Sequence, residues 1–292
     1  MRAAAILGLG SSERDLKPFQ KSSNATWLIG LPAPSEHVDA ILLFGGDGTM
    51  HRHLAQLVQL QRPVLTVPRG SGNDFARSLG LRGEKNSLAA WQKFASSDGD
   101  VRAIDLGIIT EAGQMPAQRN HYFCCVGGVG LDGEVSRRAN LLPRWLRGHG
   151  GYALTLPPAL LRFAPFPMRV LAQDPNQPDA FVTRSSGPTI VTTFANTPLY
   201  GGGMKIAPAA KLDDGLLDIC TVKAIDKFKL FCLFPTIYFG RHTGLEAVDY
   251  FQTPRLRIET DYPFDVYADG EYVCQTPIEV SVQRAALPVV IP

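Results

Sequence analysis

The sequence predicts an α/β plus β protein: a parallel α/β domain of Rossmann-like layout, followed by a mainly antiparallel β domain. Its 292 residues have about the length of two typical domains. The first hundred residues alternate apolar, strand-like runs with segments of helical spacing, whereas short β-rich runs between turn signals dominate afterwards. We therefore expect domains at residues 1–103 and 104–292, with the last few residues able to return to the first domain.

The N-terminal domain is predicted from strands and helices that alternate along the chain. Each predicted strand is a short apolar run that ends at a glycine or proline turn. The strands are Ala3–Leu9, Asp39–Phe44 and Pro63–Val67, and the helices are Leu54–Leu60, Phe75–Leu79 and Ser87–Ala95. Strand, turn and helix in this repeating order are typical of a parallel sheet.

The C-terminal domain is predicted from β-rich runs that Asp-Pro, Asp-Gly and Gly-Pro turns separate. The runs are Val101–Ile109, His121–Val126, Met168–Ala172, Thr189–Phe194, Leu216–Val222, Leu256–Thr260, Phe264–Ala268 and Ile278–Val282. Three helices are expected among them, at Leu131–Leu146, Leu154–Phe163 and Lys227–Tyr238. Closely spaced strands of this kind indicate an antiparallel sheet.

Composition excludes several classes of protein. With 45% hydrophobic and 19% charged residues, the chain is not a disordered one. Its net charge of +2 offers no broad basic surface for nucleic acid. Apolar runs stay short of the roughly 18 residues that a membrane span needs. The five cysteines form no C-x-x-C pair, which favours reduced thiols in a cytoplasmic protein over disulfides or zinc.

The strongest local motif is Gly45-Gly46-Asp47-Gly48-Thr49, which lies between an apolar strand and a helix. Glycines let backbone N–H groups approach an anion closely, and a helix N-terminus adds its positive dipole end. Asp47 could orient a metal-bound phosphate, and Thr49 could donate to a phosphate oxygen. The alternative is a plain β–α turn in which Thr49 only caps the helix. The complete motif at the end of a buried strand favours phosphate binding.

A second turn follows the next predicted strand and holds Gly70, Ser71, Gly72 and Asn73. Ligands of open α/β sheets bind beyond the carboxyl ends of the strands, so adjacent turns of this kind can build one site. Asn73 or Asp74 is equally suited to cap the following helix. The pairing of the two turns strengthens the binding interpretation of each.

Six ordered blocks give the sequence a family resemblance. They are Gly45–Thr49, Pro68–Arg77, Ile104–Gly107, Tyr200–Pro208, Leu212–Asp218 and Ala268–Glu271. As a set, they resemble the diacylglycerol kinase catalytic-domain family, and more narrowly its soluble bacterial lipid kinase branch, which is related to sphingosine and ceramide kinases. The first block alone is less specific, because NAD kinases and phosphofructokinases share it.

The resemblance implies a nucleotide-binding α/β domain, a β-sandwich domain that carries the lipid site, and a catalytic cleft between them. It implies transfer of the γ-phosphate of ATP to a lipid hydroxyl, with the nucleotide at the two glycine turns. In such kinases a structural Mg²⁺ is held by the Asp-Asp-Gly-Leu turn, here the Asp214 carboxylate with the Lys211 and Leu216 carbonyls. Asp269 matches the proton acceptor. Hard oxygen donors suit Mg²⁺, and a carboxylate suits a general base.

Three departures from the family pattern keep alternatives open. The turn after the first strand reads Gly8–Ser12 rather than an Asn-Pro phosphate turn, and Met50–His53 replace an Asn-Glu pair. The segment from Ser11 to Asp39 leaves little room for the usual helix–strand–helix. The alternatives are an NAD kinase-like enzyme acting on a soluble substrate, and a lipid- or nucleotide-binding protein that has lost catalysis.

Two features follow in the C-terminal half. Gly128–Gly133 fits G-x-G-x-x-G, but no acidic residue lies between Val135 and Gln173 to bind a ribose. Close backbone packing or a substrate-cleft lining is therefore favoured over dinucleotide binding.

The same acid-free stretch carries arginines and aromatics that suit an anionic membrane surface, with a solvated helix as the alternative. They are Arg137, Arg138, Arg144, Arg147, Arg162 and Arg169, with Trp145, Tyr152, Phe163 and Phe166. We expect a membrane lipid substrate, transient contact with the membrane surface and no nucleic acid partner, and a homodimer stays open.

Overall fold

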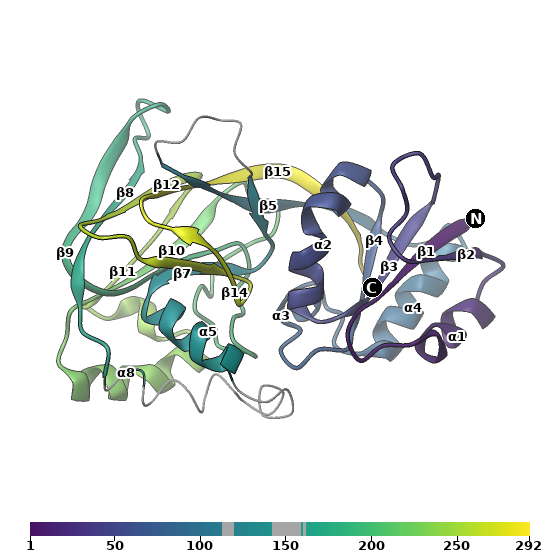
Figure 1. Ribbon diagram of the computed structural model, residues 1–292, viewed down its shortest axis with the longest axis horizontal. Helices are drawn as coiled ribbons and strands as arrows, with labels where there is room; N and C mark the ends of the chain where they lie inside the picture. Colours follow the sequence, from purple (N-terminus) through teal and green to yellow (C-terminus); the bar gives the residue numbers. More distant parts are fainter. Residues whose placement is uncertain (113–119, 142–158, 160–161) are drawn as a thin grey trace. The chain divides into compact units, whose positions relative to one another are not determined.

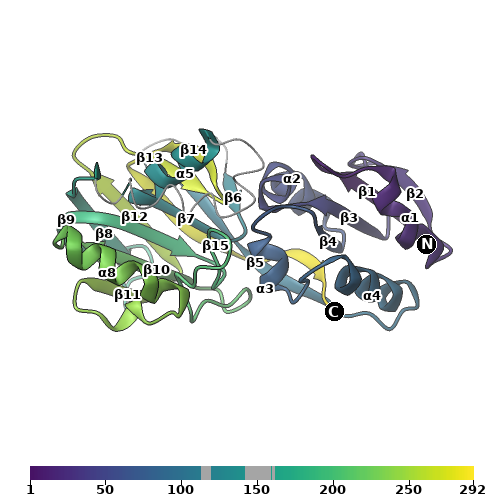
Figure 2. The ribbon, with the colours of Figure 1, turned by 90° about the horizontal axis from the view of Figure 1, so that it is seen from below.

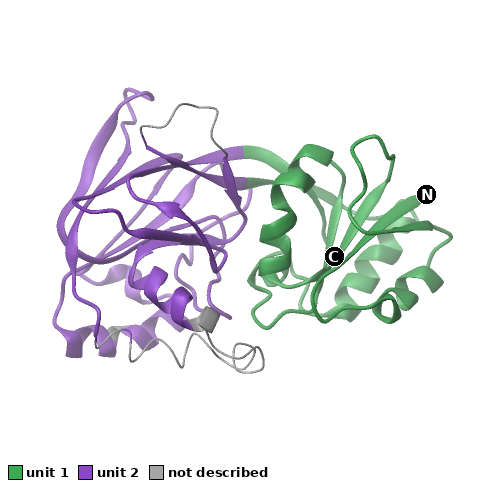
Figure 3. Ribbon diagram, viewed as in Figure 1, with its two compact units in different colours: residues 1–105, 284–292 green, residues 106–283 purple. Residues whose placement is uncertain are grey.

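The computed structural model describes residues 1–112, 120–141, 159 and 162–292, without the side chains of residues 139–141 and 233. The chain divides into two compact units (Figure 3). Unit 1 holds residues 1–105 and 284–292, and unit 2 holds residues 106–283. The division lies close to the predicted boundary at residues 103 and 104, and the C-terminal end of the chain belongs to unit 1. No helix among the described residues is long and apolar enough to span a membrane.

Unit 1 contains a parallel sheet, as the sequence predicts. Its strands β1 (Arg2–Leu7), β2 (Thr26–Ile29), β3 (Ala40–Gly45) and β4 (Val64–Pro68) are arranged in the order β4-β3-β1-β2, and every neighbouring pair is parallel. The end of β15 (Ile278–Val290) pairs in parallel with β4. All six residues of β3 are buried, which explains why this strand reads as an uninterrupted apolar run.

Four helices accompany this sheet among the described residues (Figure 1). They are α1 (Glu13–Lys21), α2 (Asp47–Leu60), α3 (Asp74–Ser78) and α4 (Glu84–Ala95). Helices α1 and α4 lie side by side, and the buried Trp91 indole N–H donates to the Phe19 carbonyl at 3.2 Å. Both α2 and α4 begin earlier than the sequence predicts. As a result, Asp47, Gly48 and Thr49 form the first turn of a helix rather than a loop.

The expectation of little room between Ser11 and Asp39 was wrong in part. Helix α1 and strand β2 both fit there, and only a second helix is missing before β3. The local signal is a capping box, because the Ser12 backbone N–H donates to the Asp15 carboxylate at 2.8 Å. Leu16 and Phe19 then supply the buried face of α1.

Unit 2 is built around antiparallel strands (Figures 1 and 2). In chain order they are β5 (Val101–Glu111), β6 (His121–Phe123), β7 (Val126–Gly130), β8 (Phe166–Gln173), β9 (Phe181–Ala195), β10 (Leu217–Lys223), β11 (Val248–Thr253), β12 (Arg255–Thr260), β13 (Asp265–Ala268), β14 (Glu271–Gln275) and β15. The main order is β14-β13-β7-β9-β8-β12-β15, while β10 pairs with β9 and β11, and β5 pairs with β15 and β6. Strands β5 and β15 each contribute residues to both units. This confirms the mainly antiparallel second domain.

The core of unit 2 is a cluster of buried apolar side chains from many of these strands. Phe123 of β6 and Phe194 of β9 pack edge to face with ring centroids 5.3 Å apart. Gly127 of β7 makes room for them, because a Cβ there would lie 2.2 Å from the Phe194 ring. The Gly128–Gly133 motif begins inside this strand, and a Cβ on its Gly130 would lie 2.5 Å from the Ile190 carbonyl oxygen, which supports close backbone packing as the role of this glycine.

The helices described in unit 2 include α5 (Leu131–Leu141) and α8 (Lys227–Tyr238), and a short 3-10 helix spans His242–Gly244. Helix α8 has the bounds that the sequence predicts. The expected helix Leu131–Leu146 is described only as far as Leu141, and the expected helix Leu154–Phe163 lies almost entirely outside the described residues.

Candidate active site

The two glycine turns of unit 1 touch each other backbone to backbone. A Cβ on Gly46 would lie 2.7 Å from the Gly70 Cα, and a Cβ on Gly70 would lie 2.5 Å from the Gly46 Cα. Strands β3 and β4 bring them together, since their parallel register runs up to the pair Gly45 and Pro68. The structure therefore places both predicted nucleotide turns at one edge of the sheet, and each glycine is required by the other.

Asp47 ties the first turn to the second. Its carboxylate accepts the backbone N–H groups of Asp74 at 3.0 Å and of Phe75 at 3.1 Å, at the start of α3. The side chain thus caps a helix from another element, and the helix dipole favours a negative charge at that point. In this geometry Asp47 holds the two turns in register. Its predicted role in orienting a metal-bound phosphate stays a prediction.

The second turn is closed by Asn73. Its side-chain oxygen accepts the Gly70 N–H at 2.8 Å and its amide nitrogen donates to the Gly70 carbonyl at 2.7 Å. Asn73 itself adopts the left-handed conformation with φ 54°, which asparagine tolerates better than most residues. This bond pair leaves Ser71 exposed at the tip of the turn beside Gly72. Ser71 is accordingly placed to meet a ligand.

Thr49 does not cap α2, so that alternative was wrong. The N-cap residue is Gly46, without a side-chain cap. Thr49 packs against two glycines instead, because a Cβ on Gly8 would lie 2.7 Å from the Thr49 hydroxyl oxygen and one on Gly45 would lie 2.6 Å from it. Gly8 belongs to the turn after β1 and donates its N–H to Phe44 at 2.7 Å. The atypical first turn is therefore built into the same sheet edge.

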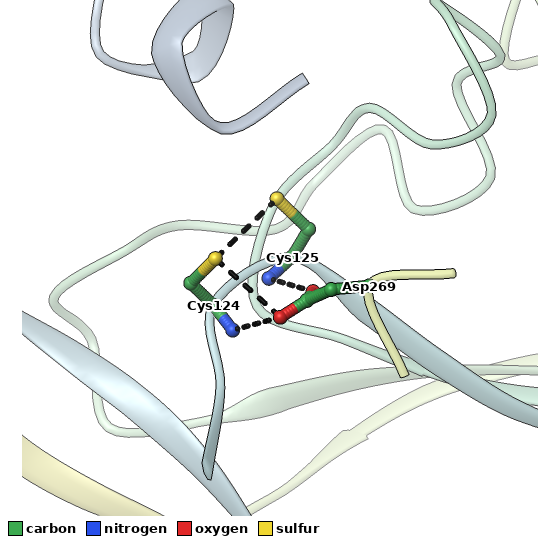
Figure 4. Close-up of side chains that lie close together, drawn as sticks. All are labelled: Cys124, Cys125 and Asp269. Carbon is green, nitrogen blue, oxygen red and sulfur yellow. Dashed lines mark hydrogen bonds between the residues drawn. The ribbon is translucent and has the colours of Figure 1, made fainter. Parts of the chain in front are cut away.

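In unit 2, Asp269 lies on the turn between β13 and β14 and is half-buried (Figure 4). Its carboxylate accepts the backbone N–H groups of Cys124 at 3.0 Å and Cys125 at 2.8 Å. Its own N–H donates to the Val126 carbonyl at 2.9 Å. Each carboxylate oxygen has two acceptor positions, so these bonds fix the orientation of Asp269 and leave it able to accept a further proton.

Two cysteines that the sequence left without a role complete this cluster. The Cys124 thiol lies 3.5 Å from the Asp269 carboxylate and 3.9 Å from the Cys125 sulfur. The two sulfurs and the carboxylate lie within 4.8 Å of one another, a spacing that could hold a metal ion. The pair was missed because adjacent cysteines match no ligand or redox spacing in the sequence.

The predicted Mg²⁺ turn precedes β10. The Asp214 carboxylate accepts the Leu216 N–H at 3.0 Å, and Gly215 takes a positive φ of 74° that shapes the turn. Asp218 follows, fully buried, and accepts a hydrogen bond from Gln252 at 3.1 Å. Burial raises the pKa of Asp218, and the charge of Asp214 raises it further. A turn with a carboxylate and several carbonyls supplies the hard oxygen donors that Mg²⁺ prefers, so the residues present fit this ion.

An apolar pocket with a cavity of about 80 Å³ lies in unit 2. Helices α5 and α8 and strand β9 contribute side chains to it, including Leu131, Ile190, Leu230, Phe234 and Ile237. Sequence reasoning missed this pocket because its lining comes from segments that are far apart along the chain. Its chemistry suits a hydrocarbon chain.

Asp132 is the acidic residue in this mainly apolar lining. The residue is 6% exposed, and its Oδ1 atom has no hydrogen-bond partner among the described residues. Burial raises the pKa of Asp132 to about 7. Gly128 makes room for it, because a Cβ there would lie 2.7 Å from the Asp132 carboxylate. The sequence gave Asp132 no function beyond its place in the glycine-rich motif.

Comparison with known proteins connects both units to one family. The model of the diacylglycerol kinase catalytic domain matches residues 13–109, and that of the YegS C-terminal NAD kinase beta sandwich-like domain matches residues 126–291. A diacylglycerol kinase of Mycobacterium tuberculosis is 35% identical over 260 residues, which cover 89% of this chain and 79% of that protein. The chain belongs to the diacylglycerol kinase family.

Further relatives agree with this assignment. A diacylglycerol kinase of Bacillus subtilis is 26% identical over 262 residues, covering 87% of this chain and 80% of that protein. A solved structure from Bacillus anthracis, described as a candidate diacylglycerol kinase, has a TM-score of 0.73 at 20% identity and covers 100% of this chain and 96% of its own. It shows that the fold is shared.

Membership of the diacylglycerol kinase family makes this chain a lipid kinase, and the family implies ATP-dependent phosphotransfer. The resemblance inferred from the six sequence blocks is confirmed. The match over residues 126–291 also confirms the sandwich-like character of the second domain. The structure brings the two glycine turns together in unit 1, and it groups Asp269 with Cys124 and Cys125 in unit 2.

Replacing Asp132 by asparagine is expected to stabilise this lipid kinase at pH 8 and not at pH 4. The pKa of Asp132 rises from 3.8 in the unfolded chain to about 7 in the folded one, so folding loses stability as pH rises between these values. Each pKa unit is worth about 1.4 kcal/mol, which gives a cost of the order of 4 kcal/mol above pH 7. Thermal unfolding of the wild type and the variant at both pH values measures the difference in stability. Asp179→Asn, at an exposed site, is the control, and a pH-independent difference for Asp132→Asn would contradict the buried-acid account.

Proposed function

We propose that this protein transfers the γ-phosphate of ATP to the free hydroxyl of a diacylglycerol. The observation that carries the proposal is Asp269, a half-buried carboxylate that two backbone amides hold in a fixed direction. It lies in the same unit as an apolar pocket that suits an acyl chain. The names of the relatives, which include diacylglycerol kinases of two bacteria, support the choice of lipid.

Asp269 would act as the general base. Its carboxylate accepts the proton of the lipid hydroxyl as that oxygen attacks the γ-phosphorus in line. The new P–O bond forms while the bond to the β-phosphate oxygen breaks, and ADP leaves with the electron pair. The backbone amides of Cys124 and Cys125 hold the base in one orientation throughout. Positioning of this kind avoids reorganisation during the reaction.

The glycine turns of unit 1 would receive the nucleotide. Gly46 and Gly70 leave the backbone open for phosphate oxygens, and the N-terminus of α2 adds its positive dipole end. Asp47 and Asn73 would contribute to nucleotide binding even without touching the nucleotide, because their hydrogen bonds fix the shape of the two turns. Ser71 at the exposed tip supplies a hydroxyl donor.

Strand β7 connects the base with the pocket. Asp269 donates to the carbonyl of Val126, and Asp132 lies against Gly128 two residues further along the same strand. Two residues of a strand span about 7 Å. This is the scale of a glycerol backbone, whose hydroxyl would reach Asp269 while an acyl chain enters the pocket. Asp132 would be neutral beside that chain below about pH 7, since burial raises its pKa to about 7.

Mg²⁺ would be held by the Asp214 carboxylate with the Lys211 and Leu216 carbonyls. A bound divalent ion there supplies positive charge that stabilises the acidic turn around Asp214 and the buried Asp218. The residues alone already shape this turn, since Asp214 accepts the Leu216 N–H.

Replacing Asp214 by alanine is expected to abolish the stabilisation of the protein by Mg²⁺. Binding to the folded state alone adds about 2.7 kcal/mol when the ion is at a hundred times its Kd. The melting temperature of the wild type should therefore rise as Mg²⁺ is added, and that of Asp214→Ala should stay constant. Asp213→Ala, at the exposed neighbouring carboxylate, is the matched control. Equal Mg²⁺ dependence in all three proteins would show that the turn binds no ion.

The test of the proposed function is the identity of the lipid that becomes phosphorylated when the protein is overproduced. Lipids extracted from these cells are compared with those from cells that overproduce Asp269→Asn, and purified protein is assayed with γ-labelled ATP on the same extract. We expect phosphatidic acid to accumulate with the wild type alone. Labelled NADP⁺ formed from NAD⁺ would favour the soluble-substrate alternative, and no labelled product at all would favour a binding protein without catalysis.

A further inference from the structure

Helix α8 carries apolar side chains on two different faces. On one face Leu230, Phe234 and Ile237, spaced by four and three residues, line the apolar pocket. An amphipathic helix normally buries one apolar face in this way. The rest of such a helix is expected to be polar where it meets water, yet α8 also exposes large aromatic side chains there.

The second face exposes aromatic rings to solvent. Phe228 is 75% exposed and Phe231 is 53% exposed, while Tyr238 and Phe239 at the C-terminal end are 38% and 71% exposed. Phe228, Phe231 and Tyr238 recur at helical spacing, so they form one stripe along α8. Large apolar side chains that gather at a surface in this way mark an interaction site. We call Phe228, Phe231, Tyr238 and Phe239 the aromatic stripe.

Basic residues flank the aromatic stripe in the sequence. Lys227 and Lys229 are exposed on α8 itself, Lys223 precedes the helix and Arg241 follows it. The only acidic residue from Lys223 to Arg241 is Asp226. Its carboxylate caps the helix by accepting the Phe228 and Lys229 N–H groups. Basic residues beside exposed aromatic rings complement an anionic bilayer, where the rings enter the headgroup region and the lysines face the lipid phosphates.

We propose that α8 docks this lipid kinase on an anionic membrane surface through its aromatic stripe. The inference rests on the proposed lipid substrate, and it also explains why the other face of the same helix lines the acyl pocket. A lipid leaving the bilayer would then meet the pocket on the inner side of the docked helix. In Figure 1 the helix lies at the margin of unit 2.

This location differs from the one that the sequence suggested. The predicted docking segment ran from Arg137 to Phe166, and its residues Arg144, Trp145, Arg147 and Tyr152 lie outside the described residues. Of its described arginines, Arg137 and Arg138 both pair with Glu134, at 3.0 and 2.5 Å. Among the described residues, helix α8 is therefore the surface that we assign to membrane docking.

The test compares the wild type with the triple variant Phe228→Ser, Phe231→Ser, Phe239→Ser. Sedimentation with vesicles of phosphatidylcholine and phosphatidylglycerol should fall about ten-fold or more, because each lost ring removes apolar burial. Activity on diacylglycerol carried in those vesicles should fall with it. Activity on a short-chain diacylglycerol dispersed as monomers should remain near that of the wild type, which also shows that the variant is folded.

The matched control is Tyr262→Ser, since Tyr262 is 76% exposed and lies off α8. It should bind vesicles as the wild type does. Exchange of Lys227 and Lys229 for glutamine should weaken binding to the anionic vesicles and leave the weaker binding to pure phosphatidylcholine unchanged. Unaltered vesicle binding by the triple variant would overturn the docking proposal. If the variant changed only its oligomeric state, the aromatic stripe would instead be a contact with a second copy of the chain.

These outcomes separate the docking proposal from the proposed function. Loss of docking with transfer to short-chain diacylglycerol intact supports both. Unaltered docking of the triple variant with intact transfer overturns the docking proposal alone. Docking that depends on the stripe, in a protein that phosphorylates no diacylglycerol, overturns the proposed function and supports α8 as the membrane contact.

Discussion

Replacing Asp269 by asparagine is expected to lower kcat for lipid phosphorylation by a factor of about 100 to 10,000. The amide keeps the size of the side chain but has one acceptor oxygen where the carboxylate has two, so it keeps one of the bonds from the Cys124 and Cys125 N–H groups and places its NH2 group at the other. It cannot take up the proton of the lipid hydroxyl. Nucleotide affinity should stay unchanged, because the glycine turns belong to unit 1. Steady-state kinetics together with calorimetric ATP titration measure both quantities.

The control for this variant is Asp265→Asn on the preceding strand β13. Asp265 accepts a hydrogen bond from Gln275 and has no contact with the cysteine amides among those described. Its replacement should leave kcat near the wild-type value. Near wild-type turnover in Asp269→Asn would assign the proton transfer to another carboxylate, for which Glu271, two residues along the same hairpin, is the first to examine.

Replacing Gly70 by alanine is expected to weaken ATP binding about ten-fold or more and to destabilise unit 1. The new methyl group would lie 2.5 Å from the Gly46 Cα and 2.9 Å from the Asn73 side-chain oxygen. The closest of these atoms is backbone and cannot rotate away, so the two turns must separate. Overpacking of this kind typically costs about 1–3 kcal/mol. Titration with a non-hydrolysable ATP analogue and thermal unfolding measure the two effects.

Gly83→Ala is the matched control in the same unit. Nothing lies within 4 Å of a Cβ at Gly83, and its backbone is extended with φ 178°, which any residue adopts. Alanine there should change neither ATP affinity nor melting temperature by much. If Gly70→Ala also left ATP affinity intact, the contact between the two turns would have no part in nucleotide binding.

Much of the fold follows from local sequence patterns. The apolar run of β3 and the glycines after it predict a buried parallel strand and its turn, and both are present. The exact bounds of α8 follow from its long apolar segment after Asp226. Helix α1 was missed, although Ser12 and Asp15 form a capping box, because the segment was judged by its length alone.

The candidate site was only partly predictable. Sequence motifs located the glycine turns and Asp269, since the chemistry of phosphate binding and proton transfer restricts the residue types. They could not show that Asp47 caps α3, because the partner amides of Asp74 and Phe75 come from another element. The apolar pocket and the buried acid Asp132 depend on tertiary packing in the same way.

Surface properties were the hardest to foresee. A helix with apolar residues all round reads from sequence as a buried one. Exposure separates the two faces of α8, with Leu230 7% exposed and Phe228 75% exposed. Only the folded chain distinguishes the aromatic stripe from the lining of the pocket.

The most direct test of the central claim is transfer of label from γ-labelled ATP to dioctanoylglycerol by the purified wild-type protein, with Asp269→Asn in parallel. We expect labelled dioctanoyl phosphatidic acid in proportion to the ADP formed with the wild type, and only a trace with the variant. Equal amounts of labelled lipid from both proteins would contradict the role of Asp269. ADP formation without any labelled lipid would contradict the assignment of diacylglycerol as the phosphate acceptor.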